Sequence, residues 1–288
     1  MQLFVQEPCF KAVFQAMGGP CELLIETDSE ALAFQLASIA QQEVERIEAK
    51  YSRYKKNNIC HDLNQSNGKA VAIDAETYRL LKFADDCYQM SEGLFDMTSG
   101  VLRKAWKFDG SNTLPDQEKI KSLLPHIGWQ KITFDHNHFV MPPNMELDFG
   151  GIGKEYAVDN VCHLLKSTAP TTAILVNLGG DLATTTTRHL NKAWRIGIEG
   201  HNDISHLEFM QGAIATSGNT HRFFEKEGVR YSHILNPKTG MPITNAPSTI
   251  TVAAPLCIEA GLLATLAILH GSEAKLFLDT QNIRYWIS

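Results

Sequence analysis

Apolar residues recur along several segments of this chain at intervals of three to five positions, the spacing of a helix with one buried face. These segments predict helices over residues 28–51, 74–91, 99–106, 117–124, from 155 onward, and 259–270. Asp28-Ser29-Glu30 opens the first helix, and Asp74 stands at the start of the second, where its short polar side chain can cap the free N–H groups. The pattern therefore predicts a substantially helical protein.

Shorter runs rich in β-branched and aromatic residues, bounded by Gly, Pro and Asn, predict strands between these helices. They cover residues 10–25 as strand, turn and strand, and then 70–73, 131–134, 138–141, 145–149, 172–178, 193–198, 206–209, 212–216, 231–235 and 248–253. Helices and strands are mixed without strict alternation, which favours an α+β fold over a doubly wound parallel sheet. The sequence contains no internal repeat and no low-complexity linker, so residues 1–288 are predicted to form a single compact body.

One stretch, LDFGGIGKEY at residues 147–156, has three glycines in four positions with Asp148 before them and Lys154 after them. Glycine lets the backbone turn sharply or approach a ligand closely. A glycine turn that opens a helix exposes N–H groups and the positive end of the helix dipole, which together favour an anion. The sequence leaves two interpretations open, an anion site and a tight connection that binds nothing.

Composition and charge narrow the class of protein. The 288 residues are 44% hydrophobic with a net charge of −6, and Lys and Arg are scattered, which argues against nucleic acid or an anionic membrane as partner. No apolar run approaches the ~20 residues of a membrane helix. The first ten residues lack the pattern of a signal peptide, and the six cysteines are widely spaced, so we expect reduced thiols and a cytoplasmic protein.

Several motifs occur together in an order typical of one known family. They are AMG at 16–18, YSRY at 51–54, GLFD at 93–96, DFGGIGKEYAVD at 148–159, VNLGGD at 176–181, ATSGN at 215–219, YSHILNPKTG at 231–240 and AT at 264–265. In this order they resemble the ApbE family, the FAD:protein FMN transferases, over about residues 10–270. The resemblance implies a single FAD-binding domain over residues 1–288, of the T-fold-like, mixed helix and sheet kind.

The activity that the resemblance implies is transfer of FMN from FAD to a Thr or Ser hydroxyl of a flavoprotein, with release of AMP. Some relatives hydrolyse FAD to FMN and AMP instead. Both reactions are substitutions at a pyrophosphate, which need a cation for the developing charge, donors for the phosphate oxygens and a base for the attacking hydroxyl. FAD and an acceptor flavoprotein are therefore the expected partners.

The resemblance also assigns roles to particular residues. His233 is the candidate for activating the hydroxyl or positioning the phosphate, although a strand histidine can equally be structural. Lys154 would face the phosphates as a point charge. Asp148 would bind hydroxyl or ring donors of FAD. The remaining expected FAD contacts are Met17, Tyr54, Leu94, Phe95, Asp96, Asn177, Ser217 and Ile234, of which the apolar members could instead be core residues.

The sequence departs from this family at the expected Mg²⁺ site. There the late helix begins Ala-Asp-Ala-Leu-Ala-Thr, and its Asp and Thr hold Mg²⁺ with a carbonyl of the glycine turn. This chain has AGLLAT at 260–265, so Gly151 and Thr265 remain as ligands and Gly261 replaces the aspartate. Two neutral oxygens make a poor site for Mg²⁺, which usually takes a carboxylate. Glu259 is expected on another side of the helix, and the sequence shows no route for Asp181.

A second departure lies in the turn, where Gly153 and Glu155 replace the usual Ala and Gly. A carboxylate at Glu155 would weaken pyrophosphate binding unless it points away, or would simply be a favourable first-turn acid. Three hypotheses result: an FMN transferase with weak or altered metal dependence, a degenerate protein that binds flavin without turnover, and an FAD pyrophosphatase.

Overall fold

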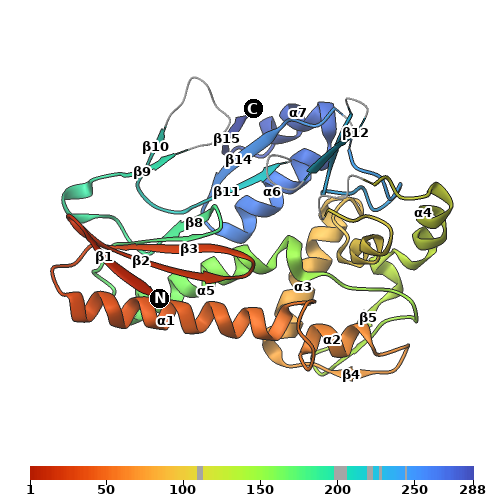
Figure 1. The fold of residues 1–288 in the computed structure, drawn as a ribbon, viewed down its shortest axis with the longest axis horizontal. Helices are drawn as coiled ribbons and strands as arrows, with labels where there is room; N and C mark the ends of the chain where they lie inside the picture. The colour runs from red at the N-terminus through yellow and green to blue at the C-terminus, as the bar shows by residue number, and fades with distance from the viewer. Residues whose placement is uncertain (109–112, 198–205, 219–222, 227–228, 244) are drawn as a thin grey trace.

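The centre of the molecule is an antiparallel sheet of eight strands in the computed structural model, which describes residues 1–108, 113–197, 206–218, 223–226, 229–243 and 245–288 (Figure 1). Along the sheet the order is β1-β2-β3-β7-β8-β11-β14-β15, and each neighbouring pair is antiparallel. The strands are β1 Gln2–Gln6, β2 Cys9–Ala16, β3 Gly19–Ile25, β7 Ile174–Leu178, β8 Asp181–Thr184, β11 Ala213–Gly218, β14 Thr249–Ala254 and β15 Arg284–Ile287.

Three helices cover one face of this sheet: α1 (Glu30–Tyr51), α5 (Gly153–Thr168) and α6 (Cys257–Leu269). In Figure 1 they follow one another from orange α1 through green α5 to blue α6. Their apolar residues meet alternate residues of the strands in the main core, since successive side chains of a strand point to opposite faces. Helix α5 thus lies between α1 and α6, and its first turn faces the middle of the sheet.

The opposite face is covered in part by the hairpin of β9 (Trp194–Gly197) and β10 (His206–Phe209). Leu175, Leu182 and Ile214 of the central strands pack there against residues of the hairpin. The two faces of the sheet therefore have separate apolar clusters, and both faces of its central strands are buried.

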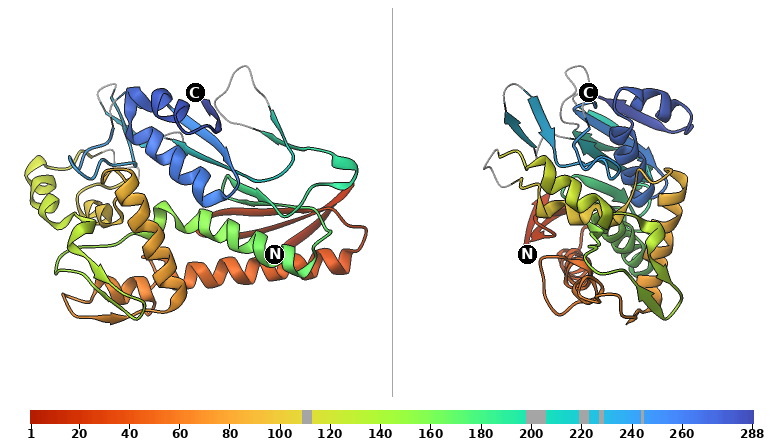
Figure 2. Two further views of the ribbon diagram at one scale, coloured as in Figure 1. Left: turned by 180° about the vertical axis from the view of Figure 1, so that it is seen from behind. Right: turned by 90° about the vertical axis from the view of Figure 1, so that its right-hand side faces the viewer.

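The remaining elements gather at one end of the sheet, where Figures 1 and 2 show α3 upright beside the short strands. They are α2 Ile59–Asn64, α3 Ala75–Met90, α4 Gln117–Leu123, the 3₁₀ helix η1 Met97–Lys104, and a small sheet of β4 Val71–Ala72, β5 Thr133–Phe134 and β6 His138–Val140. A separate hairpin joins β12 Phe223–Lys226 to β13 Val229–Ser232, and α7 (Ala274–Asp279) follows α6. The helices in the described ranges all fall short of the length and apolar character that a membrane crossing requires.

A side chain of α5 caps the start of α6. The two carboxylate oxygens of Asp159 accept hydrogen bonds from the backbone N–H groups of Cys257 and Ile258, at 2.8 and 2.9 Å. The N-cap residue Leu256 makes no side-chain bond of its own, so Asp159 satisfies donors that the helix start would leave unpaired. This contact fixes the position of α6 relative to α5.

The mixed α+β class and most predicted elements are confirmed. The predicted strand at 145–149 is wrong, because none of the strands in the described ranges contains it. The Asp148 amide donates to the Met97 carbonyl at 3.0 Å, and its carboxylate caps the 3₁₀ turn η4 (Phe149–Gly151), so local bonds replace a strand ladder. The predicted helix at 99–106 is a 3₁₀ helix that begins earlier, at Met97, after the capping residue Asp96. The prediction for 231–235 places its strand too late, since β13 ends at Ser232.

Candidate functional site

The glycine turn leads directly into α5 and leaves the start of that helix open. One carboxylate oxygen of Asp148 accepts the Gly150 amide at 2.9 Å, which holds the turn in shape. The residue before the helix, Ile152, makes no capping side-chain bond. The start of α5 therefore has no side-chain cap from the preceding residue, and the helix dipole adds positive potential there, a setting that favours an anion. A Cβ added at Gly151 would lie 3.4 Å from the ring of Phe95, so the turn packs closely on that side chain.

Lys154, in the first turn of α5, forms an ion pair with Asp181 at the start of β8. Nζ lies 2.7 Å from Oδ2, and Asp181 is almost completely buried while the lysine side chain is 39% exposed. The carboxylate also accepts a backbone hydrogen bond from Thr216. Burial raises the pKa of Asp181, and Lys154 opposes that rise. The lysine is thus held in place on one side and open to solvent on the other.

Glu155 points into the interior, toward α6, and does not remain on the surface of the first turn. Its exposure is 8%, and its Oε2 has no hydrogen-bond partner among the described residues. A Cβ built on Gly261 would lie 2.6 Å from Cγ and 2.8 Å from Oε1 of Glu155, so the side chain occupies space that any larger residue at position 261 would fill. Burial, with the negative charge of Asp181 nearby, raises the pKa of Glu155 well above its usual range.

Two of the predicted site residues meet beside these carboxylates. Thr265 lies one helical turn after Gly261 on α6, and its Oγ1 is 3.2 Å from the Oγ of Ser217 on β11. Thr216, the neighbour of Ser217, makes the backbone contact with Asp181 described above. The structure therefore brings Lys154, Ser217 and Thr265 around the buried pair Glu155 and Asp181. Glu259 is exposed, in line with the sequence argument against it.

A second ion pair lies at the other side of the glycine turn. The guanidinium of Arg53 pairs with the carboxylate of Asp148, and it also donates to the hydroxyl of Tyr54 at 2.8 Å. The same guanidinium carbon lies 4.9 Å from the centre of the Tyr54 ring, whose side chain is 79% exposed. Asp148 and Tyr54, both predicted to contact FAD, are thereby linked through Arg53.

The segment from Leu94 to Asp96 sits behind the turn. Phe95 is buried with its ring against Gly151, and Leu94 packs against the main core. The carboxylate of Asp96 is buried and accepts from the amide and hydroxyl of Thr98, at 2.8 and 2.6 Å, and from the amide of Trp129, at 3.1 Å. Burial raises the pKa of Asp96. These contacts give Asp96 a structural role, and its predicted contact with FAD stays a prediction.

Two neighbouring turns complete this edge of the sheet. Met17, at φ 51°, lies in the turn between β2 and β3, and its amide donates to Glu48 at 2.9 Å. Asn177 at the end of β7 accepts the Gly180 amide at 2.9 Å, and the Gly179 amide bonds to the Pro20 carbonyl at 3.0 Å. Gly179 and Gly180 have φ of 65° and 100°, a region that favours glycine. The predicted residues Met17 and Asn177 therefore lie on adjoining turns.

His233 and Ile234 lie in a different environment. The His233 side chain is exposed, and its ring meets that of Phe108 edge to face, with the centroids 6.4 Å apart. Phe108 stacks on Trp106, which in turn packs against Tyr231. Ile234 is half-buried against the main core. A catalytic role for His233 stays a prediction, as does the contact of Ile234 with FAD. Asn219, the last residue of the ATSGN motif, lies outside the described residues.

Sequence reasoning gave no role to Arg53, and it did not place the carboxylates of Glu155 and Asp181 together. Arg53 could have been found from its place between Ser52 and Tyr54 in the YSRY motif. The proximity of Glu155 to Gly261 joins residues far apart in sequence, so only the packing of α5 on α6 reveals it.

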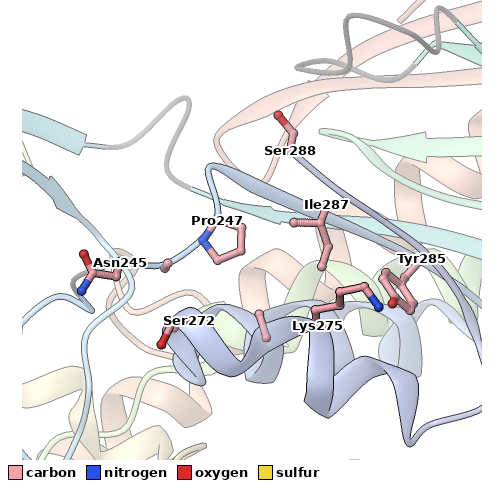
Figure 3. A pocket seen from close by; sticks show the side chains of 10 residues that line it. Asn245, Pro247, Ser272, Lys275, Tyr285, Ile287 and Ser288 are labelled. Carbon is pink, nitrogen blue, oxygen red and sulfur yellow. The ribbon is translucent and has the colours of Figure 1, made fainter.

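A surface pocket of about 570 Å³ lies elsewhere, between α7 and β15 (Figure 3). Pro247, Tyr285 and Ile287 line it, with the stem of Lys275 alongside. The Lys275 ammonium pairs with Asp279 at 2.8 Å. The residues that line this pocket include none of those predicted to contact FAD or a metal, so we assign the candidate site to the glycine turn.

The fold and this site define a class: an α+β protein in which a glycine turn, a lysine and buried carboxylates meet at a helix start beside an antiparallel sheet. Comparison with known proteins identifies the family. The chain belongs to the ApbE family, whose profile matches residues 17–287.

Among similar proteins, the FAD:protein FMN transferase of Klebsiella pneumoniae is 28% identical over 89% of this chain and 81% of its own length. The FAD:protein FMN transferase of Vibrio cholerae is 30% identical over 83% of this chain and 74% of its own length. The crystal structure of the ApbE protein from Thermotoga maritima superposes with a TM-score of 0.88 at 26% identity, covering 97% of this chain and 94% of the other.

Proposed function

We propose that this chain is an FAD:protein FMN transferase, which moves FMN from FAD to a Thr or Ser hydroxyl of an acceptor flavoprotein and releases AMP. The observation that carries the proposal is the family match, which extends over residues 17–287 and therefore includes every element of the site. The similar proteins from Klebsiella pneumoniae and Vibrio cholerae are both named for this activity. The open helix start beside a fixed lysine supplies the setting for a pyrophosphate.

In this reaction the acceptor oxygen attacks the phosphorus on the FMN side of the pyrophosphate. A new P–O bond forms to the acceptor, the bond to the bridging oxygen breaks, and AMP leaves with that oxygen. The hydroxyl proton passes to a base, for which we propose His233. Lys154 and the N–H groups of the α5 start stabilise the charge that develops on the phosphate oxygens, because they are positioned before the reaction begins.

Mg²⁺ is part of this proposal, and the residues present fit such an ion. Mg²⁺ prefers hard oxygen ligands with one or two carboxylates. The described residues contain no group of three His, Cys, Asp or Glu able to hold a metal, but they offer the Glu155 carboxylate with an unpartnered oxygen, the Thr265 hydroxyl and the Gly151 carbonyl. Such an ion would neutralise charge on the pyrophosphate.

The test is AMP release from FAD by the purified protein, with Mg²⁺ and with a chelator, in the presence of a cell extract that contains candidate acceptors. We expect Mg²⁺-dependent AMP release accompanied by a protein band that stays fluorescent with flavin after denaturation. AMP release of equal rate without any acceptor would instead identify an FAD pyrophosphatase. FAD binding without AMP release in all these conditions would overturn the enzyme proposal in favour of a flavin-binding protein.

A further inference from the structure

The side chain of Glu155 is buried with one carboxylate oxygen left unpaired among the described residues. The exposure of Glu155 is only 8%, yet its Oε2 has no hydrogen-bond partner among the described residues. A buried carboxylate oxygen without a hydrogen bond destabilises the fold unless a cation or a proton compensates it. The ammonium of Lys154 pairs with Asp181 at 2.7 Å, and its charge also acts on Glu155, where it opposes the rise in pKa that burial causes.

The space that Glu155 enters exists because position 261 has no side chain. A Cβ there would lie 2.6 Å from Glu155 Cγ and 3.0 Å from Cδ, closer than real Cβ contacts allow. Any residue larger than glycine on this face of α6 would displace the carboxylate. Glycine inside a helix costs roughly 1 kcal/mol relative to alanine, so its presence needs a compensating reason. Accommodation of Glu155 supplies that reason.

The elements beside the carboxylate carry residues with hard oxygen atoms. Thr265 follows Gly261 by one turn of α6 and therefore shares its face, and its hydroxyl lies within hydrogen-bond distance of the Ser217 hydroxyl. Gly151 is in the turn that precedes Glu155 by four residues. Asp159 fixes α6 against α5, so the spacing between the two helices at this point is defined.

We propose that Glu155, from the first turn of α5, supplies the carboxylate ligand of a divalent-cation site with Thr265 and Gly151, in the space that Gly261 leaves open. The carboxylate thus comes from α5, whereas the family resemblance expects it on α6 at position 261. This inference deepens the proposed function and rests on it for the purpose of the metal, but the binding itself can be measured without turnover.

The experiment titrates Mn²⁺ alone into the purified full-length chain and follows the loss of the free-ion signal by electron paramagnetic resonance. We expect saturable binding of one Mn²⁺ per chain. In Glu155→Gln, which keeps the shape but loses the charge, we expect the Kd to rise by about tenfold or more, because the only carboxylate ligand is neutralised. Glu259→Gln is the matched control, since Glu259 is an exposed glutamate in the first turn of α6, and its Kd should equal that of the wild type.

A second pair of variants tests the position of the charge. Glu155→Gly should lose Mn²⁺ binding, and Glu155→Gly combined with Gly261→Asp should recover it, because the new aspartate enters the vacated space. Unchanged binding in Glu155→Gln, or no saturable binding by the wild type, overturns the proposal. If Glu155→Gln does not fold, Glu155→Gly is compared with the double variant Glu155→Gly, Gly261→Asp. Equal Kd values for Mn²⁺ in these two proteins overturn the proposal.

AMP release, measured separately on the same proteins, distinguishes this proposal from the proposed function. Glu155-dependent Mn²⁺ binding without any AMP release would support the site while contradicting the transferase. Metal-dependent AMP release that Glu155→Gln leaves unchanged would support the transferase while contradicting Glu155 as the ligand.

Discussion

At the scale of single residues, the site is organised by which carboxylate pairs with which cation. Lys154 pairs with the buried Asp181 and Arg53 pairs with the half-buried Asp148, while the buried Glu155 has an oxygen without a partner among the described residues. Lys154 compensates a buried charge and remains 39% exposed, so in the proposed reaction it has two functions. A substitution there should affect both stability and activity.

We predict that Lys154→Met lowers Mg²⁺-dependent AMP release by about 10²-fold or more, the typical cost of removing one group that stabilises developing charge. It should also lower the free energy of unfolding by about 1–3 kcal/mol, because Asp181 is left buried without its cation. The measurements are initial rates with saturating FAD and unfolding in urea.

The double variant Lys154→Met with Asp181→Asn separates these effects. It should recover most of the stability, because the buried charge is gone, but none of the activity. Recovery of AMP release in the double variant would mean that Lys154 acts only by neutralising Asp181.

At the scale of secondary-structure elements, the relation between α5 and α6 determines whether Glu155, Gly261 and Thr265 meet. Asp159 maintains this relation by capping α6 from the neighbouring helix. The cap is buried, and burial raises the pKa of Asp159, while the two amide donors oppose that rise. A loss of this cap should therefore act on the site through the position of a helix.

We predict that Asp159→Ala lowers the free energy of unfolding by about 1–2 kcal/mol, the usual cost of a lost N-cap. It should also weaken Mn²⁺ binding, although Asp159 is not a proposed ligand, since α6 is no longer fixed at its start. Glu259→Ala, an exposed change in the turn of α6 that Asp159 caps, is the control and should alter stability by only a few tenths of a kcal/mol. Equal unfolding curves for Asp159→Ala and the wild type would contradict the capping role.

At the scale of the whole molecule, charged contacts at Glu76 connect three helices. Glu76, at the start of α3, accepts hydrogen bonds from Arg46 of α1, at 2.6 and 2.8 Å, and from the hydroxyl of Tyr156 of α5, at 2.8 Å. Lys50 of α1 contacts it as well. Arg46 is the largest of several partners that lower the pKa of the Glu76 carboxyl to about 2, from an ordinary value of 4.5.

This lowered pKa predicts a dependence of stability on pH. The folded state holds the ionised carboxylate more tightly than the unfolded state does, so the contribution is complete above pH 4.5 and is lost as the pH falls toward 2. We expect Glu76→Gln to be less stable than the wild type by about 1–2 kcal/mol near pH 6, a modest value because water still screens the pairs. The difference in free energy of unfolding should shrink steadily below pH 4.5.

Chemical unfolding of both proteins between pH 2.5 and 6 measures this difference. A gap between them that stays constant across that range would show that the charge of Glu76 contributes nothing, and that Gln alters packing instead.

The sequence by itself determined the local features of this protein. Periodic apolar residues and capping side chains fixed α1 and α3, with Asp74 in the predicted capping position, because these signals act over a few neighbouring residues. It did not give the strand β8, whose four residues are all buried, since burial on both faces removes the alternation that marks a strand. The ordered motifs gave the family, and the comparison confirmed it.

Only the tertiary structure decided how the site is built. The sequence showed a missing carboxylate at Gly261 and an unexpected one at Glu155 as two separate departures. Their relation depends on the packing of α5 on α6, which brings together residues more than one hundred positions apart. A side chain's direction and burial follow from such contacts and from no local pattern, so the structure alone shows that one departure fills the space left by the other.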